Sequence, residues 1–205
     1  MTTDDAEEED EPLWMLSSHE MRRRAPGHYA AKGYNAWFGA YVLWHLSDDT
    51  LEKAAEDRYG GNPRIAIGEA YRREASLALE LILKAVIACK IQRRTAPAHV
   101  KRVPQTHEVL RLWRDAALPT PSPDDATRLF DAGRTLIWTG KYGAPRTDEA
   151  GMKEHEEAER LRRVQQKSQK MAGSRGWWHT PLDWDSFDRL FHVASAELER
   201  LDGGQ

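Results

Sequence analysis

Four residues of this chain have the types and spacing to perform chemistry together: Glu80, Lys84, Arg102 and His107. Glu80 and Lys84 are four residues apart in a run of helix formers, so both side chains face the same side of a helix. His107 follows Thr106, a favourable N-cap residue, and the dipole at a helix N-terminus disfavours an imidazolium. A neutral His107 could act as a general base, while Arg102 could hold a phosphate through bidentate hydrogen bonds.

Each of these residues also has a structural interpretation that the sequence leaves open. His107 could cap its own helix or a loop. Glu80 and Lys84 could form an ion pair along the exposed edge of a helix.

The element that must position Glu80 and Lys84 is the stretch from Ala66 to Arg94. It contains no proline and no glycine after Gly68, which predicts one central helix of about 29 residues, roughly 43 Å long. Apolar residues lie almost all around this helix, so we expect other helices to cover most of its sides. One thin polar line follows 4, 3, 4, 4 spacing and comprises Glu69, Arg73, Ser76, Glu80 and Lys84.

The rest of the chain is also typical of helices, and no segment has the pattern of a strand. We expect an aromatic helix from Pro26 to about Leu46, a short helical turn and loop from Ser47 to Arg64, and helices over 107–118, 123–140, 148–172 and 183–201. This pattern predicts an all-α protein, an up-and-down bundle of about five main helices. Residues 13–147 would form the core, and residues 148–205 would add a charged helix and a C-terminal docking helix to the same domain.

Composition limits the cellular setting and the chemistry. Seven acidic residues fall between Asp4 and Glu11, and the rest of the chain has 30 basic and 26 acidic residues. Residues 1–12 are therefore expected to be a disordered acidic tail, either solubilising or competing with a polyanion for a basic surface. The single Cys89, the absence of a signal segment and the absence of an apolar span predict a cytoplasmic protein without membrane contact. Without an HExxH motif or a cysteine cluster, we expect no metal and no cofactor.

The order of these features resembles the HEPN superfamily, small all-α proteins that bind nucleotides or cleave RNA. The resemblance covers Tyr29 to Pro145. Three segments carry it: EASLALELILKAVIA with Glu80 and Lys84, THEVLRLW with His107, and LIWTGKYGAP with Trp138, Lys141 and Tyr142.

The resemblance implies a nucleotide- or RNA-binding protein that could be a metal-independent endoribonuclease in a defence or toxin-antitoxin context. His107 and Arg102 would be its catalytic residues. Nucleotide or RNA contacts would come from Glu80, Lys84, Trp138, Lys141 and Tyr142, the last three as a stacking platform beside a phosphate. Core packing of Trp138 and a helix-ending turn would explain those three residues as well.

The sequence also departs from the family pattern. Catalytic members have an arginine and a histidine with four to six residues between them near the start of a late helix, and that pair is missing at the matching place. This favours an alternative function, a non-catalytic helical module for dimerisation or partner binding. A homodimer is expected in either case, because dimers are common among the proteins that the chain resembles.

A further candidate for binding nucleic acid is the basic second half of the charged helix, from Arg160 to Lys170, although an ordinary solvated helix has the same composition.

Overall fold

The computed structural model describes residues 18–56, 59–139, 148–171 and 182–203, and the regular elements among them are all helices. The predicted all-α class is confirmed. The elements are α1 (Ser18–Arg24), α2 (Pro26–His45), α3 (Asp48–Ala55), α4 (Pro63–Gln92), α5 (Val109–Asp115), α6 (Pro123–Arg134), the π-helix η2 (Thr135–Thr139), α7 (Asp148–Met171) and α8 (Trp184–Asp202).

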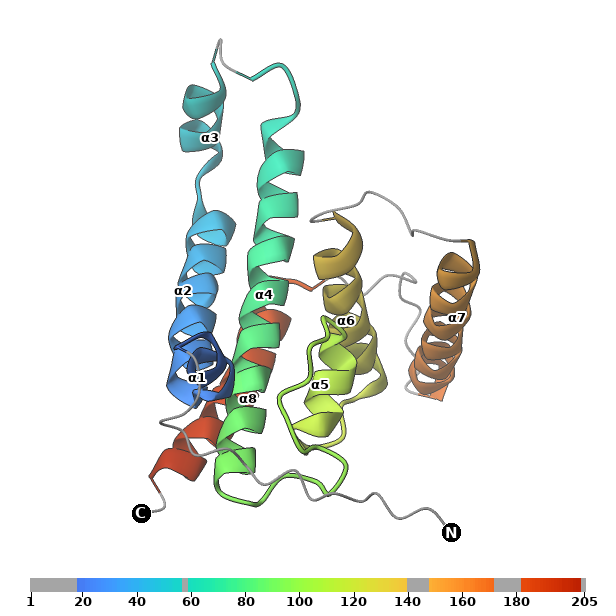
Figure 1. Ribbon diagram of the computed structural model, residues 1–205. Coiled ribbons are helices and arrows are strands. Elements are labelled where there is room, and N and C mark those ends of the chain that lie inside the picture. The colour runs from blue at the N-terminus through green and yellow to red at the C-terminus, as the bar shows by residue number, and fades with distance from the viewer. Residues whose placement is uncertain (1–17, 57–58, 140–147, 172–181, 204–205) are drawn as a thin grey trace.

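α4 lies at the centre of the bundle (Figure 1). It runs antiparallel to α2, and it also contacts α8, α5, α6 and η2, while α7 packs on α6. Most of α4 between Ala75 and Lys90 is buried. The helix with apolar residues almost all around it is thus covered on most sides, as expected.

α4 begins earlier than the sequence predicted. Asn62 is its N-cap, with the side-chain oxygen accepting hydrogen bonds from the backbone amides of Arg64 and Ile65 at 3.0 and 3.3 Å, and Pro63 occupies the first turn. The prediction placed Pro63 in a loop and started the helix at Ala66. Proline suits the first turn of a helix because its missing N–H has no intrahelical partner there.

The helix after His107 is shorter than predicted. Thr106 Oγ1 accepts a hydrogen bond from the backbone amide of Glu108 at 3.1 Å, and the helix begins only at Val109. His107 therefore lies in the segment leading into α5 and not in its first turn. The prediction was wrong on this point because the Thr106 side chain forms a local turn with the amide of Glu108, and the helix begins only at the next residue.

α2 and α4 approach closely because small residues line their interface. A Cβ atom on Gly33 would lie 3.2 Å from the backbone nitrogen of Ile82, and Ala36 and Ala40 are buried on the same face. Close backbone contact fixes the position of α2 along α4.

A buried lysine connects the end of α4 to two other helices. Lys90 Nζ donates to the carbonyl of Ala116, just after α5, at 2.7 Å, and lies 2.7 Å from Glu197 Oε1 on α8. Arg200 and Lys90 lower the pKa of the Glu197 carboxyl to about 2, although partial burial opposes the shift. This cluster holds the C-terminal ends of α4, α5 and α8 together.

Candidate functional site

Glu80 and Lys84 form a buried ion pair in the middle of α4. The Glu80 side chain is 5% exposed and the Lys84 side chain 9% exposed, and Lys84 Nζ lies 2.7 Å from Glu80 Oε1. The interpretation as a pair on an exposed helix edge is therefore wrong. The helices α2, α8, α5, α6 and η2 all pack against α4, which is why a polar pair in the middle of α4 can be buried. A buried charge needs a partner, and each of these residues supplies one for the other.

His107 completes the cluster from a distant part of the chain. Its Nδ1 lies 2.8 Å from Glu80 Oε2, and its ring is half exposed. Because a carboxylate only accepts hydrogen bonds, Nδ1 carries the proton and donates a hydrogen bond to Glu80. In the neutral imidazole this leaves the lone pair on Nε2. A carboxylate that fixes the tautomer in this way is a common means of preparing a histidine as a proton acceptor.

Gly133 allows the segment of His107 to lie against α6. A Cβ atom on Gly133 would be 3.0 Å from the carbonyl oxygen of His107 and 3.1 Å from the amide nitrogen of Val109, which are backbone atoms that cannot rotate away. The helix changes to π-geometry two residues later, at Thr135. Such π-helical segments are rare and frequently occur at functional sites. Sequence patterns gave no sign of this contact beyond a glycine inside a helix.

The charge of Glu80 affects the pKa of the Tyr29 phenol on α2. Burial raises the pKa of the Tyr29 phenol. The charge of Arg23 and a hydrogen bond with Gln105 oppose that rise, and the negative charge of Glu80 adds to it. Tyr29 is therefore within electrostatic range of Glu80, and it was not among the predicted site residues.

The remaining predicted site residues are not placed at this cluster. Arg102 is exposed in the segment between α4 and α5 and forms no ion pair within the described residues. The backbone of Trp138 lies in η2, and its side chain is not among those described. Lys141 and Tyr142 lie outside the described residues. The three residues predicted to stack and bind phosphate therefore stay a prediction.

The cluster can perform one kind of chemistry directly, the transfer of a proton at His107 Nε2. Glu80 orients the imidazole and stabilises its protonated form, as the aspartate of a serine-protease triad does for its histidine. Lys84 neutralises Glu80 through Oε1, while His107 contacts Oε2. Since its ammonium group is buried and already donates to Glu80, Lys84 is suited to hold the carboxylate in place.

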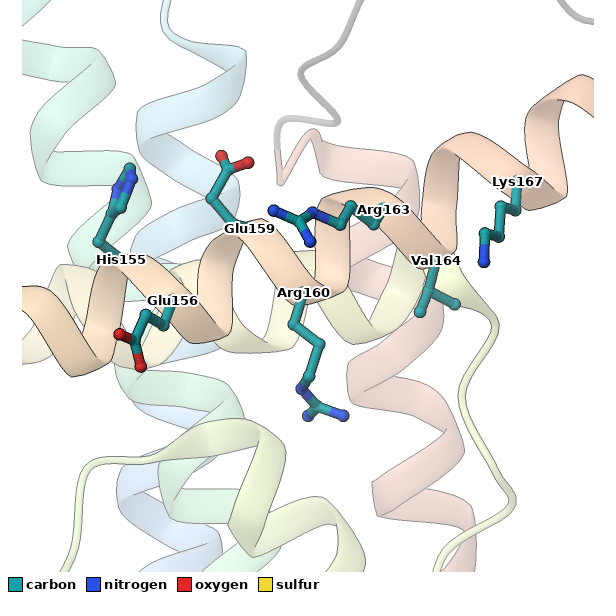
Figure 2. Close-up of a pocket in the computed structure, with 7 residues that line it drawn as sticks. All are labelled: His155, Glu156, Glu159, Arg160, Arg163, Val164 and Lys167. Atoms are coloured by element: carbon teal, nitrogen blue, oxygen red, sulfur yellow. The ribbon is translucent and has the colours of Figure 1, made fainter.

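A second surface feature is a groove of about 620 Å³ along α7. His155, Glu159 and Arg163 extend on one side of the helix, while Glu156, Arg160 and Val164 extend on the other (Figure 2). Both signs of charge line the groove, as in a solvated helix with favourable dipole and i,i+3 pairs. Figure 1 places α7 on the side of α6 away from α4, so this groove is separate from the Glu80 cluster.

Comparison of the chain with protein-family models, curated proteins and solved structures finds no match. The resemblance to the HEPN superfamily therefore stays a prediction. Among the described helices, none combines the length and the apolar character needed to cross a membrane.

Proposed function

We propose that this chain is a HEPN-like protein that binds RNA or a nucleotide and acts as a metal-independent endoribonuclease, in a defence or toxin-antitoxin setting. The observation that carries the proposal is the hydrogen bond between His107 Nδ1 and the buried Glu80 carboxylate. It joins residues 27 positions apart and leaves a half-exposed histidine with a defined proton-accepting nitrogen.

In the proposed reaction, His107 Nε2 removes the proton from a ribose 2′-hydroxyl. The 2′-oxygen then attacks the neighbouring phosphorus, and the bond from phosphorus to the 5′-oxygen breaks. The products are a 2′,3′-cyclic phosphate and a 5′-hydroxyl, the 5′-oxygen taking its proton from the solvent or from the imidazolium. This chemistry suits RNA and not DNA, because DNA has no 2′-hydroxyl.

The other proposed site residues would bind the substrate or hold the base. Arg102 is exposed and free of ion pairs in the described part of the chain, so its guanidinium is open to a phosphate. Glu80 and Lys84 would contribute by fixing His107, which their burial favours over direct contact with RNA. Trp138, Lys141 and Tyr142 are proposed to stack on a base and contact phosphate.

The test is incubation of the purified protein with single-stranded RNA, with and without a chelator. We expect cleavage that the chelator does not change, with 2′,3′-cyclic phosphate ends, and its loss in His107→Ala. A matched control is His99→Ala, because His99 Nε2 also contacts a buried carboxylate, Asp115, at 3.2 Å. Equal cleavage by wild type and His107→Ala would exclude the catalytic role.

The second candidate function is a non-catalytic helical module for dimerisation or partner binding. The observation in its favour is the set of exposed aromatic side chains on α2, which includes Phe38 at 60% exposure. Under this function, RNA would be neither bound nor cut, and variants at His107 would behave as wild type.

A further inference from the structure

Two segments of the chain carry basic residues and no acidic ones. One is 93–107, the connection from α4 to the start of α5, and the other is 21–47, which covers the end of α1 and all of α2. Neither contains an aspartate or a glutamate, although the chain has 33 acidic residues in total. Five exposed cations of these segments form what we call the basic strip: Arg22, Arg23, Arg94, Lys101 and Arg102.

Hydrogen bonds bring the two segments together at the end of the bundle where α4 terminates (Figure 1). The Gln92 side chain, at the end of α4, donates to the carbonyl of Arg24 at 3.1 Å. In the first turn of α2, the Tyr29 hydroxyl donates to the carbonyl of Arg23 at 3.0 Å and also hydrogen-bonds with the side chain of Gln105. The end of α1 is therefore connected to both ends of the 93–107 segment, and at Gln105 it is two residues from His107.

The cations of the basic strip are available to an anionic ligand. Arg22, Arg94 and Lys101 are exposed, as Arg102 is, and form no ion pair within the described residues. Arg23 lies 3.4 Å from Glu20, but its side chain is 60% exposed. An exposed pair of this kind contributes only about 0–1 kcal/mol, so a phosphate can replace Glu20 as the partner of Arg23 at little cost.

We propose that the basic strip binds the phosphates of a polynucleotide, so that the substrate presented to His107 is an RNA chain and not a mononucleotide. This inference rests on the proposed function, which names RNA or a nucleotide. A single phosphate group carries at most about two negative charges, whereas five cations match a chain with a charge on each of its phosphates. Four of the five are arginines, whose planar guanidinium binds phosphate through two parallel hydrogen bonds.

A chain held by the basic strip would present one ribose to His107 Nε2 while the neighbouring phosphates contact the strip. Contacts to phosphates fix the position of a nucleic acid without reading its bases. We therefore expect affinity to depend on chain length and on salt, and only weakly on sequence.

Binding can be measured apart from cleavage with a 2′-O-methyl RNA, which has phosphates but no free 2′-hydroxyl to attack them. The probe is a fluorescent chain of about 12 nucleotides, a length within the usual range for single-strand sites, and anisotropy reports its binding to the full-length wild type. Five phosphate contacts predict a slope of log K against log salt of about −3.5. Adenosine monophosphate at the same concentration of phosphate should not displace the probe.

The variant that tests the basic strip combines Arg22→Ala, Arg94→Ala and Lys101→Ala. At about 0.1 M salt each lost contact should weaken binding about 5-fold, so the triple variant should bind roughly 100-fold more weakly, with a slope near −1.4. Circular dichroism should find it as helical as wild type, because all three side chains are exposed.

A matched control removes the same charge elsewhere and should bind as wild type does: Arg72→Ala with Arg163→Ala and Lys167→Ala. All three side chains are exposed. Arg72 is about 30 Å from Arg94 along α4, and the other two residues are in α7, the other basic candidate for nucleic acid.

The results separate the basic strip from the proposed reaction. A strip variant that binds as wild type does, a larger loss in the control, or displacement of the probe by adenosine monophosphate would overturn the inference, even if wild type cleaves RNA. The expected binding without any RNA cleavage would leave the strip in place and refute the reaction. Absence of binding by wild type would overturn both.

Discussion

The buried Glu80–Lys84 pair makes a quantitative prediction, because α7 contains a matched pair on its exposed surface. Glu149 and Lys153 have the same i,i+4 spacing and a similar N···O distance, 2.8 Å against 2.7 Å. Their side chains are 73% and 74% exposed, against 5% and 9% for Glu80 and Lys84. The two pairs therefore differ in burial and in the hydrogen bond that Glu80 also accepts from His107.

Burial determines the cost of removing one partner. Glu80→Leu leaves the Lys84 ammonium buried without a counter-charge, and a broken buried pair costs about 3–5 kcal/mol. In a chain of this size that corresponds to a fall in Tm of roughly 10 °C. Replacing both residues, as in Glu80→Leu with Lys84→Met, should cost less than either single change because no charge is then left buried.

A double-mutant cycle measures the coupling for each pair. We expect a coupling energy of roughly 2–3 kcal/mol or more for Glu80 with Lys84, and about 0.3–0.5 kcal/mol for the same substitutions at Glu149 and Lys153. Urea unfolding gives the free energies, with an unchanged m-value as the check that unfolding stays two-state. Similar coupling energies for the two pairs would refute the argument from burial.

Three further predictions concern other parts of the fold. Gly133→Ala should destabilise the protein by about 1–3 kcal/mol in urea unfolding, because the added methyl group meets the backbone of His107. The control Gly68→Ala, with open space around it, should be neutral or stabilise by up to about 1 kcal/mol. Equal effects of the two changes would contradict the close contact at Gly133. Since the folded-state pKa of Glu197 is lowered to about 2 from 4.5, its contribution to stability is present above about pH 4.5 and is lost as the pH falls towards 2. Glu197→Gln should therefore make the unfolding free energy less dependent on acid pH, as measured by urea unfolding at several pH values. An unchanged pH profile would contradict this role of Glu197. The buried hydroxyl of Tyr71 has no hydrogen-bond partner in the described part of the chain, so Tyr71→Phe should be neutral or raise the unfolding free energy by up to about 1 kcal/mol. A clear loss of stability in urea unfolding would contradict the absence of a partner there.

Local sequence patterns predicted the helices well because their causes are local. The continuous helix formers after Pro63 specify α4, and the four-residue spacing puts Glu80 and Lys84 on one side of it. The errors at its start and before α5 arose at helix ends, where a proline or a threonine suits more than one local geometry.

The parts of the site that sequence could not settle depend on packing between distant segments. The i,i+4 spacing of Glu80 and Lys84 is the same whether the pair is buried or exposed, and the packing of the other helices around α4 decides between the two. The contact of Gly133 with the segment of His107 leaves no local pattern, because it depends on how α6 packs on α5.

The aromatic residues of α2 illustrate a related limit. The sequence predicted an aromatic helix here, but the small residues Gly33, Ala36 and Ala40 form the close contact with α4. The rings of Tyr34, Phe38 and Tyr41 stay exposed. Which face of an aromatic helix stays exposed depends on its partners in the fold.

The most direct test of the central claim, a His107 base held by Glu80, is the rate of RNA cleavage by wild type and Glu80→Gln. Glutamine keeps the size of the side chain and can still accept from Nδ1, but it removes the negative charge that stabilises the imidazolium formed during proton transfer. We expect wild type to cleave RNA, and Glu80→Gln of unchanged helicity to cleave it about 10²-fold or more slowly. Cleavage at the same rate in Glu80→Gln as in wild type would contradict the claim, as would the absence of any RNA cleavage by wild type.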